Sequence, residues 1–264
     1  MLIPQSLSIP LRTTIKREFM KQWIILFVIC LAWSLMWVDF TAVNVALAPI
    51  SKDLHTNLAT LQWVITSYTV CSAAFMSIGG RLGDMYGHRR LFVLGTFIFT
   101  FSSILAGFSF NASLLIGSRI GQGIGIAMVV PIATALVYLT FDEKRQGIAL
   151  GFLTGTTGIA MAIGPTIGGL LCTYLNWRWV FFINVPTGVI AIIMSYMLID
   201  ETQEKKVFKI DFLGIITLIL GLLSFLLGLN KISDWRGSYL LGMFLLALAF
   251  FYLFIKCEQK IVNL

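Results

Sequence analysis

The sequence predicts an all-α polytopic membrane protein. Its 264 residues are 58% hydrophobic and only 12% charged, which lies far outside the range of soluble domains. The apolar residues gather in runs of about twenty, the length that crosses the hydrocarbon core of a bilayer as a helix. Most charged residues lie between these runs. The three observations together exclude a soluble domain and predict a bundle of spanning helices.

Eight apolar runs are long enough to span a membrane. The expected spans are 23–43, 61–80, 91–110, 114–139, 148–174, 179–199, 212–229 and 238–255. The first has no small-residue cleavage site, so we interpret it as a retained helix rather than a signal peptide. The charged loop 200–211 separates a six-helix bundle, 23–199, from a two-helix unit, 212–264. The segment 1–22 is expected in the cytoplasm, either as a surface helix or as a disordered basic tail.

Basic residues in the short loops predict the orientation, because Lys and Arg are retained on the cytoplasmic side. With the N-terminus inside, fourteen of them lie in the cytoplasm and four lie outside. The inside set is Arg12, Lys16, Arg17, Lys21, Arg81, Arg89, Arg90, Lys144, Arg145, Lys205, Lys206, Lys209, Lys256 and Lys260. The outside set is Lys52, Arg178, Lys231 and Arg236. We therefore expect a multi-pass protein of the cell membrane with both termini in the cytoplasm, and no role in nucleic-acid binding.

Cysteine and histidine residues do not form a pattern typical of metal binding or catalysis. Cys30, Cys71, Cys172 and Cys257 lie in or beside apolar runs without a CxxC pair, so we expect reduced packing residues. The two histidines lie in loops, and no nucleophile shares a span with a base. The sequence thus predicts no cofactor, no metal and no intramembrane enzyme.

Asp39 and Arg119 are the two ionisable residues inside expected spans. A charge at a bilayer centre costs about 2.5 to 3.5 kcal/mol on insertion scales, so each needs a partner or a water-filled cavity. Each lies about five residues from the outer end of its helix, which gives both a depth of roughly 8 Å. Equal depth permits an ion pair, and an embedded carboxyl group can carry a proton. The alternatives are a purely structural pair or an aspartate solvated from outside. Gln122, Gln62, Thr66 and Tyr68 are candidate neutral contacts.

Glycines form stripes on the fourth and fifth expected spans. Gly117, Gly121 and Gly125 recur every four residues, and we interpret this stripe as a surface for close helix packing. The fifth span carries Gly151, Gly155, Gly158, Gly164, Pro165, Gly168 and Gly169. Proline removes a backbone hydrogen bond, so this pattern predicts a bent and tightly packed helix.

Several stretches, in order along the chain, resemble one family. GGRLGDMYGHRRL, residues 79–91, is similar to the loop between helices two and three of the major facilitator superfamily. LLIGSRIGQGIG resembles its fourth-helix arginine motif, and GIAMAIGPTIGGLL resembles its fifth-helix antiporter motif. DFTAVNVALAP, LQWVITSY and NWRWVFFINVPTG resemble stretches of its fourteen-helix drug:proton antiporters. The resemblance implies a six-helix N-terminal bundle followed by two linker helices.

The resemblance also implies roles for individual residues. Asp39 and Arg119 would couple the protein to protons. A cytoplasmic charge cluster that locks one conformation would comprise Gly80, Asp84, Gly87, Arg89 and Arg90, although these residues are also explained by topology alone. The bend that limits leak would comprise Gly164, Pro165, Gly168 and Gly169. The resemblance does not identify residues that bind substrate.

The sequence departs from the family pattern in detail and in length. Met85 and His88 stand where the family has basic residues, Ala160 replaces a glycine, and Pro49 falls one position late. The family has a second six-helix bundle, which this chain lacks. We therefore expect part of a proton-coupled multidrug exporter, with drugs, protons and lipid as partners. The alternative is a truncated, non-transporting fragment that packs with other chains. Oligomeric state is open.

Overall fold

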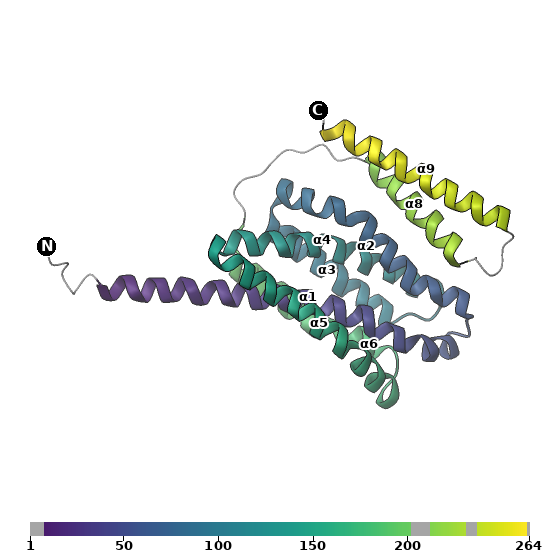
Figure 1. Cartoon of the computed structure of the whole chain (residues 1–264). Helices are drawn as coiled ribbons and strands as arrows, with labels where there is room; N and C mark the ends of the chain where they lie inside the picture. Colours follow the sequence, from purple (N-terminus) through teal and green to yellow (C-terminus); the bar gives the residue numbers. More distant parts are fainter. Residues whose placement is uncertain (1–7, 202–211, 231–236, 263–264) are drawn as a thin grey trace.

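The computed structural model describes residues 8–201, 212–230 and 237–262, and every regular element in these ranges is a helix (Figure 1). In chain order the helices are α1 (Ser8–Asp53), α2 (Leu58–Tyr86), α3 (His88–Gly107), α4 (Ala112–Thr140), α5 (Glu143–Tyr174), α6 (Trp179–Phe182), α7 (Asn184–Leu198), α8 (Phe212–Asn230) and α9 (Gly237–Val262). The expected loop 200–211 lies outside the described residues, apart from Asp200 and Glu201.

Short connections join the helices, and an asparagine N-cap precedes both α2 and α4. The side-chain oxygen of Asn57 accepts a hydrogen bond from Thr60 N at 2.8 Å, and Asn111 caps Leu114 N at the same distance. An N-cap satisfies one of the backbone N–H groups that a helix leaves free at its start. The caps therefore start α2 and α4 just before the apolar runs.

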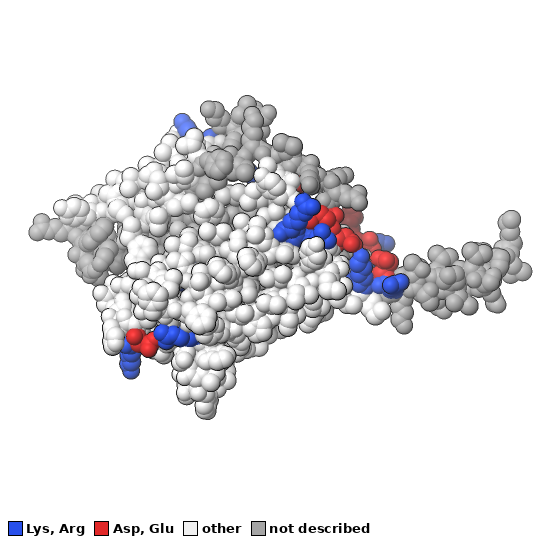
Figure 2. All heavy atoms as spheres, turned by 180° about the vertical axis from the view of Figure 1, so that it is seen from behind, with Lys and Arg blue, Asp and Glu red and all other residues white. Residues whose placement is uncertain are grey.

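Most of these helices can cross a membrane. Among the described residues, six segments are long and apolar enough: α1, α3, α4, α5, α9 and the combined α6–α7 segment. Helix α2 adds a seventh if its two parts, which meet at 51°, count as one span. Helix α8 contributes a shorter apolar stretch, Ile216–Leu229. Figure 2 shows charged side chains gathered toward the ends of the molecule, with an uncharged band between. The polytopic all-α architecture is confirmed.

The first seven helices form one bundle, and the last two form a separate pair. Helix α1 packs along α5 and α7, α2 along α4, and α3 along α4 and α7. Ile29, Met36, Phe92, Phe99 and Leu153 are among the fully buried side chains of the bundle core. Helices α8 and α9 pack on one another and meet the bundle through α2 (Figure 1). The expected six-span bundle with two additional helices is thus observed.

Two features differ from the expected spans. Helix α1 is continuous from Ser8 to Asp53, so residues 8–22 continue the helix of the first span rather than form a separate element. The expected span 179–199 is divided at Ile183 into α6 and α7. Pro186 explains the division, because proline has no N–H to donate to the carbonyl four residues earlier. Helix α7 therefore begins at Asn184, a residue of the candidate site.

Candidate functional site

Asp39 of α1 and Arg119 of α4 form an ion pair inside the bundle. Arg119 Nη1 lies 2.5 Å from Asp39 Oδ2, and the two side chains are 1% and 0% exposed. The equal depth expected from helical rise therefore brings the two residues together. A buried pair of this kind depends on further hydrogen bonds, because both ions have lost their hydration.

Arg119 has three partners besides Asp39. Its Nε donates to the Val64 carbonyl of α2 at 3.1 Å, and its Nη1 donates to Gln122 Oε1 at 2.7 Å. Its guanidinium carbon lies 4.1 Å from the centre of the Tyr68 ring, within the range of a cation–π contact. Gln122 and Tyr68 thus provide the neutral contacts expected of them, whereas Gln62 is exposed on α2.

Asp39 accepts hydrogen bonds from two amides. Asn184 Nδ2 donates to Asp39 Oδ1 at 2.7 Å, and Gln122 Nε2 donates to the same oxygen at 3.2 Å. Both amides also donate to Ser103 Oγ of α3, at 3.4 and 2.8 Å, and that hydroxyl donates to Phe99 O at 2.8 Å. The side chains of Asp39, Ser103, Arg119, Gln122 and Asn184 therefore form one connected network, and all five are buried.

Sequence reasoning missed Asn184 and Ser103, although a signal for Asn184 existed. Asn184 lies five residues after the start of the expected span 179–199, as Arg119 does in span 114–139. The two spans run in the same direction, so the depth argument that linked Asp39 to Arg119 applies equally to Asn184. Ser103 gave no such signal, because serine is common in transmembrane helices.

Glycines beside the network let the helices approach closely. A side chain at Gly123 would lie 2.7 Å from the Tyr68 carbonyl of α2, and one at Gly125 would lie 2.7 Å from the Gly95 carbonyl of α3. Gly121 faces Ser102, whereas Gly117 faces open space. The expected packing role therefore holds for Gly121 and Gly125. These contacts hold α2 and α3 against the part of α4 that carries Gln122.

The glycines of the expected antiporter motif face α1. A β-carbon at Gly164 would overlap Thr41, and one at Gly168 would lie 2.7 Å from the Ala42 carbonyl. A β-carbon at Gly169 would have room, at 3.9 Å from Val45. Helix α5 continues through Pro165 as a single element. Gly164 and Gly168 thus let α5 contact α1 within one turn of Asp39.

The charged turn between α2 and α3 depends on Gly87. This residue has φ +104°, a backbone conformation that favours glycine, and a β-carbon there would overlap the Glu201 carboxylate. Gly80 makes ordinary contact with Pro131 of α4 at 3.6 Å. Asp84 Oδ1 lies 3.4 Å from Nε2 of His88, which begins α3. The turn is therefore held against both α4 and the end of α7.

Arg89 and Arg90 pair with Glu201, which the sequence did not indicate. Their Nε atoms lie 3.6 and 3.3 Å from Glu201 Oε2. Arg89 also donates to Ile199 O at 3.4 Å, and its guanidinium lies 5.2 Å from the Tyr196 ring centre. The two arginines thus tie the start of α3 to the segment just after α7. They were expected to cluster with Asp84, which instead faces His88.

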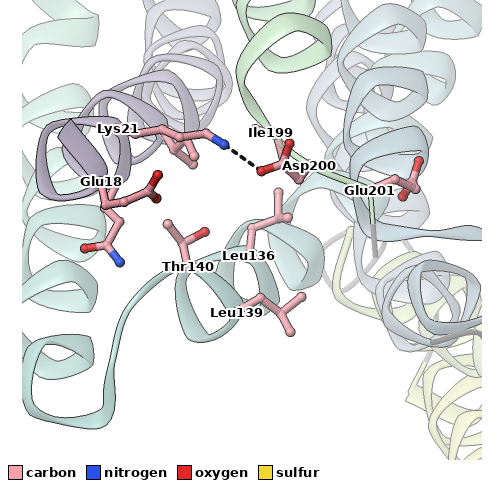
Figure 3. Close-up of a pocket in the computed structure, with 10 residues that line it drawn as sticks. Glu18, Lys21, Leu136, Leu139, Thr140, Ile199, Asp200 and Glu201 are labelled. Carbon is pink, nitrogen blue, oxygen red and sulfur yellow. Dashed lines mark hydrogen bonds and ion pairs between the residues drawn. The ribbon is translucent and has the colours of Figure 1, made fainter. Parts of the chain in front are cut away.

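A surface cavity of about 290 Å³ lies at this same end of the bundle (Figure 3). It is lined by Glu18, Lys21, Gln22, Ile25, Leu136, Leu139, Thr140, Ile199, Asp200 and Glu201. Lys21 Nζ lies 2.7 Å from Asp200 Oδ2, and this hydrogen bond raises the pKa of the Lys21 amine, which lies before the expected span 23–43. Lys21 precedes Asp39 by 18 residues, about 27 Å along the helix. The cavity is therefore separate from the buried network.

A second polar cluster holds the opposite end of the bundle together. Arg178 Nη1 donates to Asp53 Oδ2 at 2.6 Å, and Trp177 Nε1 donates to the same oxygen at 3.1 Å. Arg178 Nη2 donates to Ser109 O at 3.2 Å. Asp53 ends α1, ten residues beyond the expected span 23–43. The hydrogen bond from Arg178, followed by that from Trp177, lowers the pKa of the Asp53 carboxyl.

The chain matches the family model of the Major Facilitator Superfamily over residues 22–256. The chain belongs to this superfamily. Its members are membrane transporters, so this is a multi-pass protein of a transporter family. Within the described residues, no group of three or more His, Cys, Asp or Glu side chains could hold a metal ion.

Curated members of the superfamily resemble the chain at similar levels. It is 34% identical to the riboflavin transporter RibZ of Clostridioides difficile, over 93% of this chain and 54% of that protein. It is 36% identical to the multidrug transporter protein MdtP of Bacillus subtilis, over 84% of this chain and 41% of that protein. It is 34% identical to the multidrug export protein EmrB of Haemophilus influenzae, over 79% of this chain and 41% of that protein. The chain spans about half the length of the curated relatives it matches.

Solved structures of the superfamily share the fold. A bacterial homologue of the human lysosomal transporter Spinster, in an inward-facing and unoccupied conformation, matches with a TM-score of 0.57 and 18% identity. That match covers 70% of this chain and 44% of the other. A peptide transporter POT matches with a TM-score of 0.59 and 13% identity, over 65% and 37%. These matches support the bundle architecture described above.

Proposed function

We propose that the six-span bundle of this chain is the proton-binding half of a proton-coupled multidrug exporter in the cell membrane. The observation that carries the proposal is a fully buried carboxylate, Asp39, paired with Arg119 and surrounded by neutral hydrogen-bonding groups. Multidrug transporters among its relatives support drugs as the substrate class. Both termini lie in the cytoplasm in this proposal, as the distribution of basic residues favours.

Arg119 keeps its other partners when the charge of Asp39 changes. A proton on Asp39 removes the attraction between the two side chains, while Arg119 keeps Val64 O, Gln122 Oε1 and the Tyr68 ring. Protonation therefore loosens the contact between α1 and α4 and leaves Arg119 held by α2 and α4. Loss of the proton restores the ion pair. This cycle links proton exchange to the relative position of α1.

The test is transport in proteoliposomes by the protein expressed from its own complete reading frame. An outwardly directed proton gradient should drive uptake of a fluorescent amphipathic cation, and Asp39→Asn should abolish this flux. Asp53→Asn is the matched control, because Asp53 lies on the same helix outside the network. We expect it to keep most of the flux. Flux that survives Asp39→Asn would refute the proton role of this residue.

The same assay separates the two functional alternatives. Flux from the complete frame but none from the 264-residue chain alone identifies the chain as a half that needs a second bundle. The absence of flux in both preparations favours a non-transporting protein. Riboflavin is the second compound to be tested in this assay, since one relative is a riboflavin transporter. Flux of riboflavin without flux of the cation would contradict the multidrug part of the proposal.

A further inference from the structure

One acceptor in the buried network has no donor. Asn184 is fully buried, and among the described residues no group donates a hydrogen bond to its Oδ1. Its Nδ2 is well used, because it donates to Asp39 Oδ1 at 2.7 Å and lies 3.4 Å from Ser103 Oγ. This orientation suits an ionised Asp39, because a carboxylate can only accept hydrogen bonds. The amide oxygen is then left unpaired beside the ion pair.

The other groups of the network are already committed. Gln122 Oε1 accepts from Arg119 at 2.7 Å, and Gln122 Nε2 donates to Ser103 at 2.8 Å, so rotation of this amide would break both bonds. The Ser103 hydroxyl donates to Phe99 O. Asn184 is therefore the amide that can turn about its Cβ–Cγ bond without disturbing Arg119.

We propose that Asn184 is a positioning residue that holds Asp39 in both of its protonation states. With Asp39 ionised, Nδ2 donates to the carboxylate, as observed. When Asp39 takes up a proton, the amide turns, its bond from Nδ2 breaks, and the new carboxyl O–H donates to Oδ1. This inference rests on the proposed function, since it requires Asp39 to bind a proton.

The exchange leaves one amide atom unpaired in each state. In the ionised state that atom is Oδ1, and in the protonated state it is Nδ2. Asn184 therefore provides a hydrogen-bond partner to the ionised carboxylate and to the protonated carboxyl group, which steadies the position of this side chain in both states. The groups that bind Asp39 are Arg119 and Gln122 from α4 and Asn184 from α7. The titratable side chain from α2 is Tyr68, whose ring lies against Arg119 and whose hydroxyl donates to Met36 O of α1. Arg119 is the charged group among these.

Infrared difference spectroscopy of the 264-residue chain in lipid nanodiscs tests this inference. The C=O band of protonated Asp39 is identified as the acid-induced band that Asp39→Asn removes. In Asn184→Leu, which has a similar size but no hydrogen-bonding atoms, this band should move to higher frequency because the acid has lost its acceptor. Ser195→Ala is the matched control on α7, since Ser195 Oγ is buried and also has no hydrogen-bond partner among the residues that the structure describes. In Ser195→Ala, the C=O band of protonated Asp39 should stay at the wild-type frequency.

A wild-type measurement covers the case in which Asn184→Leu does not fold. In protein labelled with ¹³C-asparagine, acidification should shift one side-chain amide C=O band to lower frequency, and this shift should be absent in Asp39→Asn. An unshifted amide band, or an unchanged acid band in Asn184→Leu, would overturn this inference about Asn184 but not the proposed proton-carrying function of Asp39. The absence of any titrating Asp39 band in the wild type would also overturn the proton-carrying function.

Discussion

Arg119 connects three helices in the interior of the bundle. It is among the largest fully buried side chains, and it connects α1, α2 and α4 through Asp39, Val64 and Gln122. A buried ion pair is weak evidence for stability as a pair, because desolvation offsets the attraction. Removal of one partner is different, since it leaves the other charge uncompensated in a low-dielectric interior. The two substitutions should therefore be strongly coupled.

We expect Arg119→Leu to destabilise the folded chain by about 3–5 kcal/mol, because Asp39 is left as an unpaired buried carboxylate. Adding Asp39→Asn should recover much of this loss, because the second substitution removes the remaining charge. The measurement is the free energy of unfolding of both single variants and the double variant in mild detergent, combined as a double-mutant cycle. Losses that simply add would show that the two side chains do not interact.

The sequence predicted the pair but not its surroundings. Helical rise and span boundaries were sufficient to place Asp39 and Arg119 at one depth. The same boundaries place Asn184 there too, but a neutral amide has a low insertion cost and therefore does not require a partner as a charge does. Glu201 was missed for another reason. Its pairing with Arg89 and Arg90 joins residues more than 110 positions apart, and helix periodicity carries no information on such contacts.

At the scale of helices, the glycines of α5 have two different environments. Gly164 and Gly168 face the backbone of α1, whereas Gly151, Gly155 and Gly158 face open space. The sequence showed one dense glycine pattern and did not distinguish these groups, because the distinction depends on which helix packs on which face. Only the first group fixes the distance between α1 and α5.

We expect Gly168→Ala to destabilise the bundle by about 1–3 kcal/mol, because its β-carbon would lie 2.7 Å from the Ala42 carbonyl and force the helices apart. Gly155→Ala makes the same chemical change on the same helix where nothing lies within 4 Å. It should be neutral or stabilising by up to about 1 kcal/mol, because alanine favours helix formation. Thermal unfolding of both variants provides the comparison. Equal effects would contradict the assigned contact.

The cluster around Asp53 should make stability depend on pH at one end of the bundle. Hydrogen bonds from Arg178 and Trp177 lower the pKa of Asp53 in the folded state. A lowered folded-state pKa stabilises the protein above the unfolded value, about 3.9, and this contribution disappears as pH falls through the folded value. Because both side chains are partly exposed, the effect is small, about 0.2–1 kcal/mol.

The corresponding variant is Asp53→Asn, compared with wild type in detergent at pH 7 and at progressively lower pH. At pH 7 the variant should be slightly less stable, because it has lost its charge-assisted bond to Arg178. The difference should shrink below about pH 4 as the wild-type carboxyl becomes protonated. A difference that is constant with pH would show that the ionised carboxyl contributes nothing to this cluster.

Hydropathy alone predicted some helix boundaries and not others. The apolar runs located the spans of α2 to α5 within a few residues, and asparagine caps set two of the starts. Hydropathy did not reveal the division at Ile183, because a proline near the start of a helix is tolerated without dividing that helix. It also did not show that residues 8–22 continue α1, since their amphipathic pattern suited a separate helix equally well.

At the scale of the whole molecule, the charged residues that the structure describes lie toward the two ends, apart from the buried pair of Asp39 and Arg119. The ends differ in the number of basic residues: those at the end with the α2–α3 turn include Arg81, Arg89, Arg90, Lys144 and Arg145, whereas the described part of the other end carries Lys52 and Arg178. This asymmetry favours the first end in the cytoplasm. The direction of every proton or drug movement in the proposed cycle depends on this orientation.

Cysteine labelling in intact cells tests the orientation. The background is a chain without Cys30, Cys71, Cys172 and Cys257, which are free thiols. In it, Lys52→Cys should react with a membrane-impermeant maleimide in intact cells, because Lys52 is exposed at the end expected outside. Lys144→Cys, exposed in the first turn of α5, should react only after permeabilisation. The reverse pattern would place Asp39 nearer the cytoplasmic face, and the direction of proton entry to the network would then be inverted.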